Sequence, residues 1–266
     1  MDFKGRVALI TGAGSRQGIG REIALFLAKN GADVVVADYN LEGAKEVSEE
    51  VRSFGRKAIA VQVDVANSAS VDGMVDSALN EFGKVDILVN SAGITQPVKV
   101  IDTPEADWDR IIAVNLKGTF LCSKAVLKSM MKQNYGRIVN LSSVSAKRGG
   151  GVYGGAHYSA AKAGVLGFAK ALAREVAEYG ITVNSVCPGM IETNIRKNSA
   201  ALGVDPINFK NAELPTEVEQ AIIASVPVGR LGYAIEVAET VAFLASEGAA
   251  YITGEDIDIN GGSHMD

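Results

Sequence analysis

Short apolar runs alternate along the chain with longer segments in which apolar residues recur every three to four positions. The short runs have the length of β-strands, and the longer segments have the periodicity of amphipathic helices. Runs such as the consecutive Val34, Val35 and Val36 are apolar without alternation, which is typical of strands buried on both faces of a sheet. Seven strands are predicted: Val7–Thr11, Asp33–Asp38, Lys57–Val65, Val85–Asn90, Arg137–Leu141, Thr182–Val186 and Asp256–Ile259.

Helical segments separate these strands, and the first of them is followed by Gly31, a residue suited to a left-handed helix C-cap. Strands that alternate with helices imply right-handed βαβ crossovers and a parallel sheet. We therefore expect an α/β fold of the Rossmann type, a doubly wound parallel seven-stranded sheet with helices on both faces, built as a single domain over residues 1–266. The predicted helices are Arg21–Asn30, Leu41–Phe54, Ser68–Phe82, Pro104–Lys132, His157–Tyr179 and Glu236–Ser246.

The least regular part of the chain runs from Pro188 to Gly232 and contains Pro206, Pro215 and Pro227. Long irregular insertions in compact domains are often lids or binding loops. Ligands of open α/β sheets bind at the carboxyl ends of the strands. We therefore expect a substrate loop or lid at about residues 190–230, beside a site built from strand-end residues.

Composition and charge exclude several classes of protein. The chain is 47% hydrophobic with a formal net charge of -5 and no Lys/Arg-rich run, so it lacks the positive surface that binds nucleic acid or anionic membranes. No signal peptide precedes the first strand, and no stretch approaches the roughly 20 apolar residues that span a bilayer. Cys122 and Cys187 lack CxxC spacing, and His157 and His264 are the only histidines. We expect reduced, buried thiols, no metal site and a cytoplasmic protein.

A glycine-rich loop joins the first predicted strand to the first predicted helix, and residues 11–20 read TGAGSRQGIG. Glycines in such a loop let the backbone approach a pyrophosphate. The start of the following helix supplies unpaired N–H groups and the positive end of the helix dipole. The alternative, a merely tight turn, is disfavoured because the loop lies between a strand and a helix. The loop therefore predicts a dinucleotide-binding site.

Asp38 ends the second predicted strand and indicates which dinucleotide is bound. A carboxylate at this place accepts hydrogen bonds from the ribose hydroxyls of NAD and repels the 2′-phosphate of NADP. Arg16 argues in the other direction, because its guanidinium is able to neutralise such a phosphate. We expect NAD, with NADP as the less favoured cofactor.

Tyr158 and Lys162 lie four residues apart in a predicted helix, so they share one face. A free tyrosine has a pKa near 10, so an acid/base that works near pH 7 to 8 needs a pKa lower by roughly two to three. An ammonium ion about 4 Å away contributes roughly 4 kcal/mol at an effective dielectric constant near 20. The pair therefore predicts a tyrosine acid/base activated by a lysine, although a bare pair of this kind also occurs on surface helices.

An ordered set of motifs accompanies this pair. It comprises the glycine loop, Asn90-Ser91-Ala92-Gly93 after the fourth strand, Asn115 within VNLKG, Ser143 after the fifth strand, and Pro188-Gly189. In this order the motifs resemble those of the short-chain dehydrogenase/reductase family, and the resemblance extends over essentially the entire chain. The resemblance implies an NAD(P)-dependent oxidoreductase that acts on CH–OH groups.

The resemblance also implies a role for each residue. Tyr158 is the general acid/base, and Lys162 lowers its pKa and holds the nicotinamide ribose. Ser143 positions the reacting oxygen, and Asn115 supports a water-linked proton path from Lys162. The expected cofactor contacts are Gly12, Ser15, Gln17, Gly18, Ile19, Gly20, Asp38, Asp64 and Val65 (at the adenine), Asn90, Ala92, Gly93, Tyr158, Lys162, Pro188, Gly189, Ile191 and Thr193.

Two features depart from the family pattern. The usual loop is TGxxxGxG, and this chain carries two extra residues before Gly18. About two additional residues also lie between Ser143 and Tyr158, within the glycine-rich residues 149–155, and they reshape a wall of the expected substrate pocket. Gln17 stands where a basic residue marks NADP preference in the family, which supports NAD.

The substrate is defined less closely than the chemistry. Besides Ser143 and Tyr158, we consider His157 a candidate contact, with Arg148 and Arg196 for an anionic group; solvated surface cations are the alternative for the arginines. The leading hypothesis is the interconversion of a secondary alcohol and a ketone on a sugar, polyol or sugar acid. A 3-oxoacyl-thioester (acyl carrier protein) reductase is the alternative, although its usual NADPH conflicts with Asp38. A non-catalytic NAD-binding sensor is the alternative from another class.

We expect a homotetramer with a small-molecule substrate and no nucleic-acid or membrane partner. The resemblance implies an oligomer, and the last strand is expected at the edge of the sheet, where pairing or burial removes a liability. The last predicted helix is also apolar at Val237, Val241, Phe243 and Leu244.

Overall fold

A seven-stranded sheet forms the centre of the protein in this computed structural model, which describes residues 1–150, 154–193, 220–221 and 223–265. All neighbouring strands are parallel, in the order β3-β2-β1-β4-β5-β6-β7. This order confirms the Rossmann-type fold. The strands are β1 (Val7–Thr11), β2 (Asp33–Asp38), β3 (Ala58–Gln62), β4 (Ile87–Asn90), β5 (Gly136–Leu141), β6 (Ile181–Pro188) and β7 (Asp256–Ile259).

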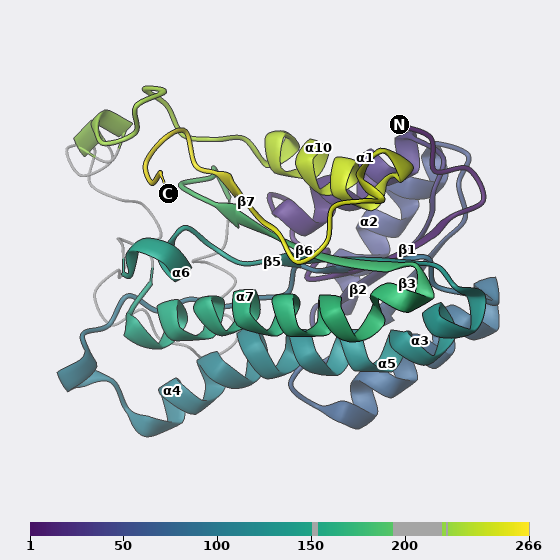
Figure 1. Cartoon of the computed structure of the whole chain (residues 1–266), viewed down its shortest axis with the longest axis horizontal. Helices are drawn as coiled ribbons and strands as arrows, with labels where there is room; N and C mark the ends of the chain where they lie inside the picture. Colours follow the sequence, from purple (N-terminus) through teal and green to yellow (C-terminus); the bar gives the residue numbers. More distant parts are fainter. Residues whose placement is uncertain (151–153, 194–219, 222, 266) are drawn as a thin grey trace.

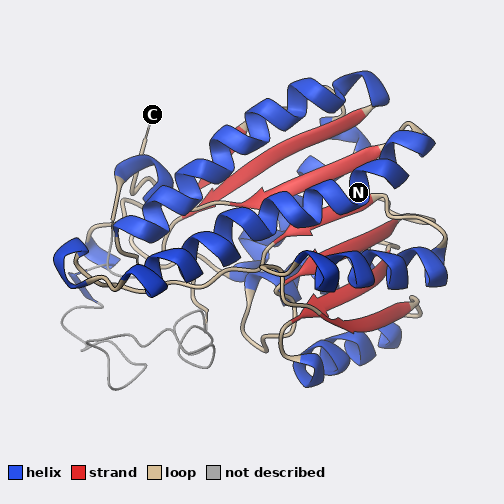
Figure 2. Cartoon of the chain, turned by 90° about the horizontal axis from the view of Figure 1, so that it is seen from below, coloured by secondary structure: helices blue, strands red, loops and turns tan. Residues whose placement is uncertain are grey.

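Helices cover both faces of the sheet, with α1, α2 and α10 on one side and α3, α5 and α7 on the other (Figures 1 and 2). Strand residues alternate between the two layers: Ile10 packs under α1, and its neighbour Leu9 packs under α3 and α5. The described helices are α1 (Ile19–Lys29), α2 (Leu41–Ser53), α3 (Ser68–Phe82), α4 (Glu105–Ile112), α5 (Gly118–Gln133), α6 (Ser145–Arg148), α7 (Ala156–Val176) and α10 (Ala234–Ala245).

Local chemistry sets several helix ends. The α3 helix begins and ends where the sequence predicts, because the Asn67 side chain accepts from the Ser70 N–H at its start and Gly83 adopts φ 76° at its end. Gly31 likewise adopts φ 105° after α1, as expected. The long helical segment predicted from Pro104 contains one irregularity, a π-helical turn at Ala113–Lys117 between α4 and α5.

The sequence prediction was wrong for the end of the third strand. The apolar run continues to Val65, but β3 stops at Gln62. The Val63 N–H then donates to the Asp38 carbonyl, and residues 63–66 turn across the carboxyl ends of the strands. The short helix α6 was not predicted at all.

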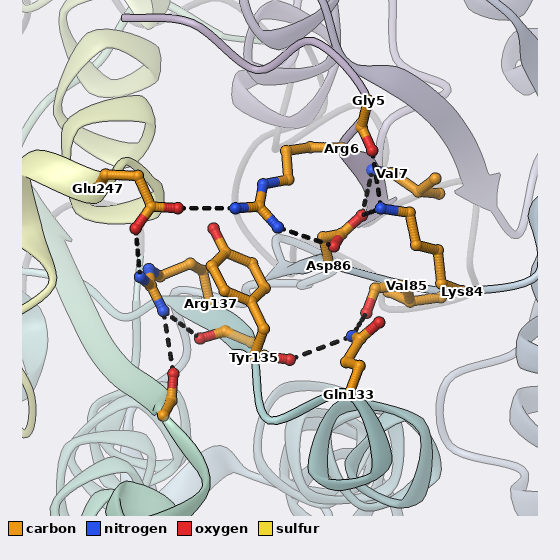
Figure 3. A network of polar contacts seen from close by, with 12 residues as sticks. Gly5, Arg6, Val7, Lys84, Val85, Asp86, Gln133, Tyr135, Arg137 and Glu247 are labelled. Carbon is orange, nitrogen blue, oxygen red and sulfur yellow. Dashed lines mark hydrogen bonds and ion pairs between the residues drawn. The ribbon is translucent and has the colours of Figure 1, made fainter.

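A polar network fastens the amino ends of the central strands (Figure 3). Arg137 is 3% exposed and donates to the Gly180 carbonyl and to Glu247. Arg6 pairs with Glu247 and with the buried Asp86, and the Tyr135 ring lies 3.7 Å from the Arg6 guanidinium and 4.4 Å from that of Arg137. A ligand site is expected at the carboxyl ends of the strands. The network lies at the opposite end of the sheet.

Most of the predicted lid lies outside the described residues, since 194–219 and 222 are not described. The two ends of the segment meet: the Glu192 N–H donates to the Gly232 carbonyl at 3.0 Å, and the Gly232 N–H donates to the Met190 carbonyl at 2.9 Å. Within the described part of the chain, no helix is long and apolar enough to cross a membrane. Cys122 and Cys187 are free and buried, as predicted.

Candidate active site

A cavity of about 850 Å³ opens at the carboxyl ends of the strands. It lies where β1 and β4 are neighbours, which is the point at which the strand order reverses and where open α/β sheets bind ligands. The structure brings most of the expected site residues together around it: Gly12, Ser15, Gly18, Ile19, Gly20, Asp38, Asp64, Val65, Ala92, Gly93, Ser143, Arg148, Tyr158, Lys162, Pro188, Gly189, Ile191 and Thr193.

The glycine loop fits the backbone of a dinucleotide. Gly12 adopts φ 69°, and a Cβ atom there would lie 2.6 Å from the Ala92 Cα. A Cβ at Gly20 would lie 2.4 Å from the Gly12 carbonyl oxygen, so the start of α1 packs directly on the loop. Gly18 precedes α1 in an extended conformation without a side-chain cap. The first N–H groups of α1 therefore have no side-chain cap, which suits a pyrophosphate.

Asp38 is held in a fixed orientation at the edge of this cavity. Its Oδ2 accepts from the Gly14 N–H at 2.7 Å and its Oδ1 accepts from the Asn40 N–H at 2.9 Å. Burial raises the pKa of Asp38, although hydrogen bonds from backbone N–H groups oppose this effect. A negative charge is thus anchored where the ribose of a dinucleotide is expected.

Arg16 and Gln17, between the second and third glycines of the loop, are exposed and do not line the cavity, whereas Ser15 does. Arg16 makes a bidentate ion pair with Glu46 on α2, with Nε and Nη2 at 2.8 and 2.9 Å from the two carboxylate oxygens. Gln17 is exposed and does not line the cavity, so the structure does not support the cofactor contact expected for it.

Tyr158, Ser143 and Lys162 form a polar group in the lining of the cavity. Tyr158 is 8% exposed and Lys162 is 4% exposed. The Lys162 Nζ donates to the Leu141 carbonyl at 2.7 Å and lies 5.8 Å from the centre of the Tyr158 ring. A hydrogen bond with the Ser143 side chain lowers the pKa of Tyr158.

The expected lowering of the tyrosine pKa by the lysine is not found. Burial raises the pKa of Tyr158 to about 12, and this effect exceeds that of the Ser143 hydrogen bond. Burial also lowers the pKa of Lys162 to about 8. The physical reason is that desolvation penalises the charged form of each group. The sequence argument considered the charge on the lysine but not the burial of both residues.

Asn115 lies in the π-helical turn and is completely buried. Its Nδ2 donates to the carbonyls of Ile94 and Ile111 at 2.9 and 3.0 Å, while its Oδ1 has no partner among the described residues. That oxygen faces Gly93, where a Cβ atom would lie 2.8 Å from it and 3.4 Å from the Lys162 Nζ. Asn115 is therefore adjacent to Lys162 but does not line the cavity.

Asn90 is a support residue in this structure rather than a cavity-lining one. It is 4% exposed, and its Nδ2 donates to the Ser123 hydroxyl and to the Asn140 Oδ1 at 3.0 and 2.8 Å. The amide thus cross-links β4 to β5 and α5 below the cavity. The direct cofactor contact expected for Asn90 is not supported by this placement.

The candidate substrate residues divide into three groups. Arg148 lines the cavity and Arg196 lies outside the described residues. His157 is 1% exposed and does not line the cavity, so the expected substrate contact is not supported. Sequence reasoning missed Arg110 on α4, which lines the cavity as well, because only the fold shows that α4 and α6 border the same opening.

Comparison with known proteins shows which families and structures this chain is similar to. The family described as enoyl-(acyl carrier protein) reductase matches residues 12–264. A relative from Sinorhizobium fredii, named an uncharacterized short-chain type dehydrogenase/reductase, is 44% identical over 263 residues, 98% of either chain. A 3-oxoacyl-[acyl-carrier-protein] reductase from Escherichia coli is 44% identical over 265 residues, 100% of either chain. The crystal structure of levodione reductase superposes with a TM-score of 0.88 at 34% identity, covering 98% of either chain.

Proposed function

The chain belongs to the short-chain dehydrogenase/reductase family, and we propose that within it the protein interconverts 3-oxoacyl and 3-hydroxyacyl thioesters with NAD(H). The family is one of oxidoreductases acting on CH–OH groups, which favours an enzyme over the sensor alternative. The comparisons do not support the sugar or polyol substrate expected from the sequence. The observation that carries the thioester proposal is the full-length similarity to proteins named 3-oxoacyl-[acyl-carrier-protein] reductase, at up to 44% identity.

The lining of the cavity agrees with an acyl substrate. Apolar side chains from four different segments border it beside the polar group. Such a wall suits an acyl chain better than a polyol, whose hydroxyls need hydrogen-bonding partners. The residues concerned are Ile94, Val144, Met190, Ile191 and Leu231. Arg110 and Arg148 add two guanidinium groups suited to the phosphates of a thioester carrier.

The protonation state of Tyr158 favours reduction of the 3-oxoacyl group over oxidation of the 3-hydroxyacyl group. A reduced nicotinamide held beside Tyr158 and Lys162 would supply the hydride chemistry for the C3 carbon of the 3-oxoacyl group. The Tyr158 phenol, with a pKa of about 12, is protonated at neutral pH and donates its proton to the C3 oxygen. The Ser143 hydroxyl donates a second hydrogen bond to that oxygen as it gains negative charge, so it acts mainly in the transition state.

Lys162 and Asn115 restore the proton. Lys162 has a pKa of about 8, so its ammonium form is able to return a proton to the tyrosinate. Asn115 is placed to support a proton path to Lys162 through its unpartnered Oδ1. Lys162 also holds the nicotinamide ribose in this proposal.

Asp38 supports NAD(H) over NADP(H). Its carboxylate, fixed by the Gly14 and Asn40 N–H groups, suits ribose hydroxyls and repels a 2′-phosphate. Arg16, which the sequence left as a possible phosphate partner, is paired with Glu46.

A substrate panel tests the proposal. Initial rates are measured from NADH absorbance with acetoacetyl-CoA, the same acyl group on acyl carrier protein, a cyclic diketone and, in the oxidation direction, a set of polyols and sugar acids. We expect the highest kcat/KM with a 3-oxoacyl thioester. Turnover of polyols without turnover of either thioester contradicts the proposal. The ratio of the two thioesters identifies the carrier.

We also propose a homotetramer, although one sequence argument for it is corrected. Val237, Val241 and Leu244 are fully buried within the chain and pack in the layer shared by α10 and α1, so they do not call for a partner. What remains is that Phe243, the fourth apolar residue named on this helix, is 39% exposed, and that among the described strands β7 pairs with β6 alone. Light scattering at micromolar concentration that gives a stable monomer mass contradicts this proposal.

A further inference from the structure

A buried histidine stands directly before Tyr158 and has no part in the chemistry described above. His157 is 1% exposed and Gln96, its side-chain neighbour, is fully buried. The Tyr158 N–H lies 3.0 Å from the His157 Nδ1, and the His157 Nε2 lies 3.0 Å from the Gln96 Oε1. Both nitrogens of this buried imidazole are in hydrogen-bond contact, so the ring does more than fill space in the core.

The direction of these hydrogen bonds follows from the groups at the two ends. The backbone N–H of Tyr158 only donates, so the His157 Nδ1 is the acceptor and the ring proton sits on Nε2. The Nε2–H then donates to the Gln96 Oε1, which turns the Gln96 amide nitrogen toward Asp107, at 2.8 Å from its Oδ2. A carboxylate accepts, so every bond in the chain from Asp107 to Tyr158 has one consistent direction.

Two further contacts hold the imidazole and the start of α7 in the same place. The Gly155 N–H donates to the Gln96 carbonyl at 2.9 Å. The Trp108 ring stacks on the His157 ring, with 6.5 Å between centroids and an interplanar angle of 27°. A Cβ atom at Gly155 would lie 2.9 Å from the His157 Cε1, so the helix start packs closely on the ring.

Asp107 and Trp108 belong to α4, and Gln96 belongs to the loop after β4. The chain of hydrogen bonds therefore joins three separate elements at the first turn of α7. The N–H groups of a first helical turn have no partner within the helix, so without His157 the Tyr158 N–H would need another acceptor. Burial lowers the pKa of His157, although a hydrogen bond with the Gly155 backbone and the charge of Asp107 oppose this effect, and the net lowering favours the neutral ring that this arrangement requires.

We propose that His157 and Gln96 are positioning residues that fix the first turn of α7, and with it the Tyr158 hydroxyl, relative to Ser143 and the reacting oxygen. The proposal rests on the role of Tyr158 in the proposed function. Neither side chain touches the cavity, so their effect is on geometry alone. A displacement of about 1 Å at a reacting group is able to lower turnover by about a hundredfold.

Three variants separate this role from simple packing. His157→Phe keeps a ring against Trp108 but removes both nitrogens, and His157→Asn restores an acceptor near the Tyr158 N–H. Gln96→Met removes the partner of the Nε2–H with little change in volume. His264→Gln, at the other histidine of the chain, is the matched control.

We expect His157→Phe to lower kcat by about 10- to 100-fold while KM and the Kd for NADH stay within about twofold. His157→Asn should recover at least part of that loss. The double variant with Gln96→Met should be no slower than His157→Phe alone, since both changes break one chain of hydrogen bonds. Wild-type kcat in His157→Phe, or a loss confined to KM, overturns the proposal.

A spectroscopic measurement needs no substrate and so separates this proposal from the proposed function. In ¹⁵N-labelled His264→Gln protein, His157 supplies the only pair of imidazole nitrogen signals. We expect a protonated Nε2 and an unprotonated Nδ1 at pH 7.5, with the Nε2 signal shifted by Gln96→Met. A cationic ring or a proton on Nδ1 refutes the proposed direction of the hydrogen bonds. If the wild-type protein reduces no thioester, only the proposed function fails, and the kinetic test uses whichever substrate of the panel is turned over.

Discussion

Replacing Asp38 with asparagine tests how the protein selects its cofactor. Asparagine keeps an oxygen for the Gly14 N–H, now 2.7 Å from the Asp38 Oδ2, and removes the negative charge. Two unit charges about 4 Å apart repel by about 1 kcal/mol in water and about 4 kcal/mol at an effective dielectric constant near 20. Asp38 is half-buried, so the repulsion of a 2′-phosphate should lie between these limits. Since about 1.4 kcal/mol is a factor of ten, NAD should be preferred by about 5- to 700-fold.

The expected result of Asp38→Asn is a rise of at least about fivefold in kcat/KM with NADPH, with a smaller change for NADH. Glu46→Gln should add to this effect, because it releases Arg16 from its ion pair and leaves the guanidinium free for a phosphate. Glu49→Gln on the same helix is the control, since Glu49 pairs with Arg52 instead. Because burial raises the pKa of Asp38, the wild-type preference for NADH should also weaken as the pH falls toward that pKa.

Two outcomes refute this reasoning. One is a wild-type enzyme that prefers NADPH, which means that Asp38 does not face the 2′-position. The other is an Asp38→Asn variant with unchanged NADPH kinetics, which means that the charge is too well solvated to discriminate.

The remaining predictions concern catalysis and stability. Tyr158→Phe should lower kcat by about 10²- to 10⁴-fold with little change in the Kd for NADH, and near-normal turnover would show that another group is the acid. In the wild type, kcat for reduction should fall as the pH rises through about 8, the pKa of Lys162, and a flat profile to pH 10 speaks against proton return from the lysine. Gly12→Ala should weaken NADH binding, followed by fluorescence, at least about tenfold, because the new Cβ meets the Ala92 backbone at 2.6 Å and φ is 69°. Arg137→Met should lower the free energy of unfolding in urea by about 1–3 kcal/mol and leave kcat unchanged, since its network lies at the far end of the sheet.

The sequence predicted the fold well because its apolar runs are strong and well separated. The α3 boundaries follow from Asn67 and Gly83, residues whose preferences are local. The end of β3 was missed because Val63 and Val65 are apolar for a different reason: they are buried beside the cavity rather than within the sheet. Hydrophobicity alone does not distinguish the two environments.

The sequence predicted the site residues whose place follows from their spacing along one strand or helix. It missed those whose place depends on contacts between segments distant in the sequence. The glycine loop, Asp38 and the tyrosine–lysine pair follow strand ends or share a helix face, so spacing was enough. Gln96 and Arg110 carry no such signal, because what matters is a contact between segments distant in the sequence. The cofactor contact of Gln17 stays a prediction, since its side chain is exposed and does not line the cavity.

Burial changes the order in which the tyrosine and the lysine hold their protons. In water a tyrosine, with a pKa near 10, is slightly more acidic than a lysine, with a pKa near 10.4. In this site the pKa of Tyr158 is about 12 and that of Lys162 is about 8, so the lysine ammonium is the stronger acid. Proton transfer from Lys162 to a tyrosinate is therefore downhill, whereas loss of the Tyr158 proton to solvent is uphill. The desolvation that raises the pKa of Tyr158 and lowers that of Lys162 thus suits the proposed reduction, in which Tyr158 donates a proton and Lys162 returns one.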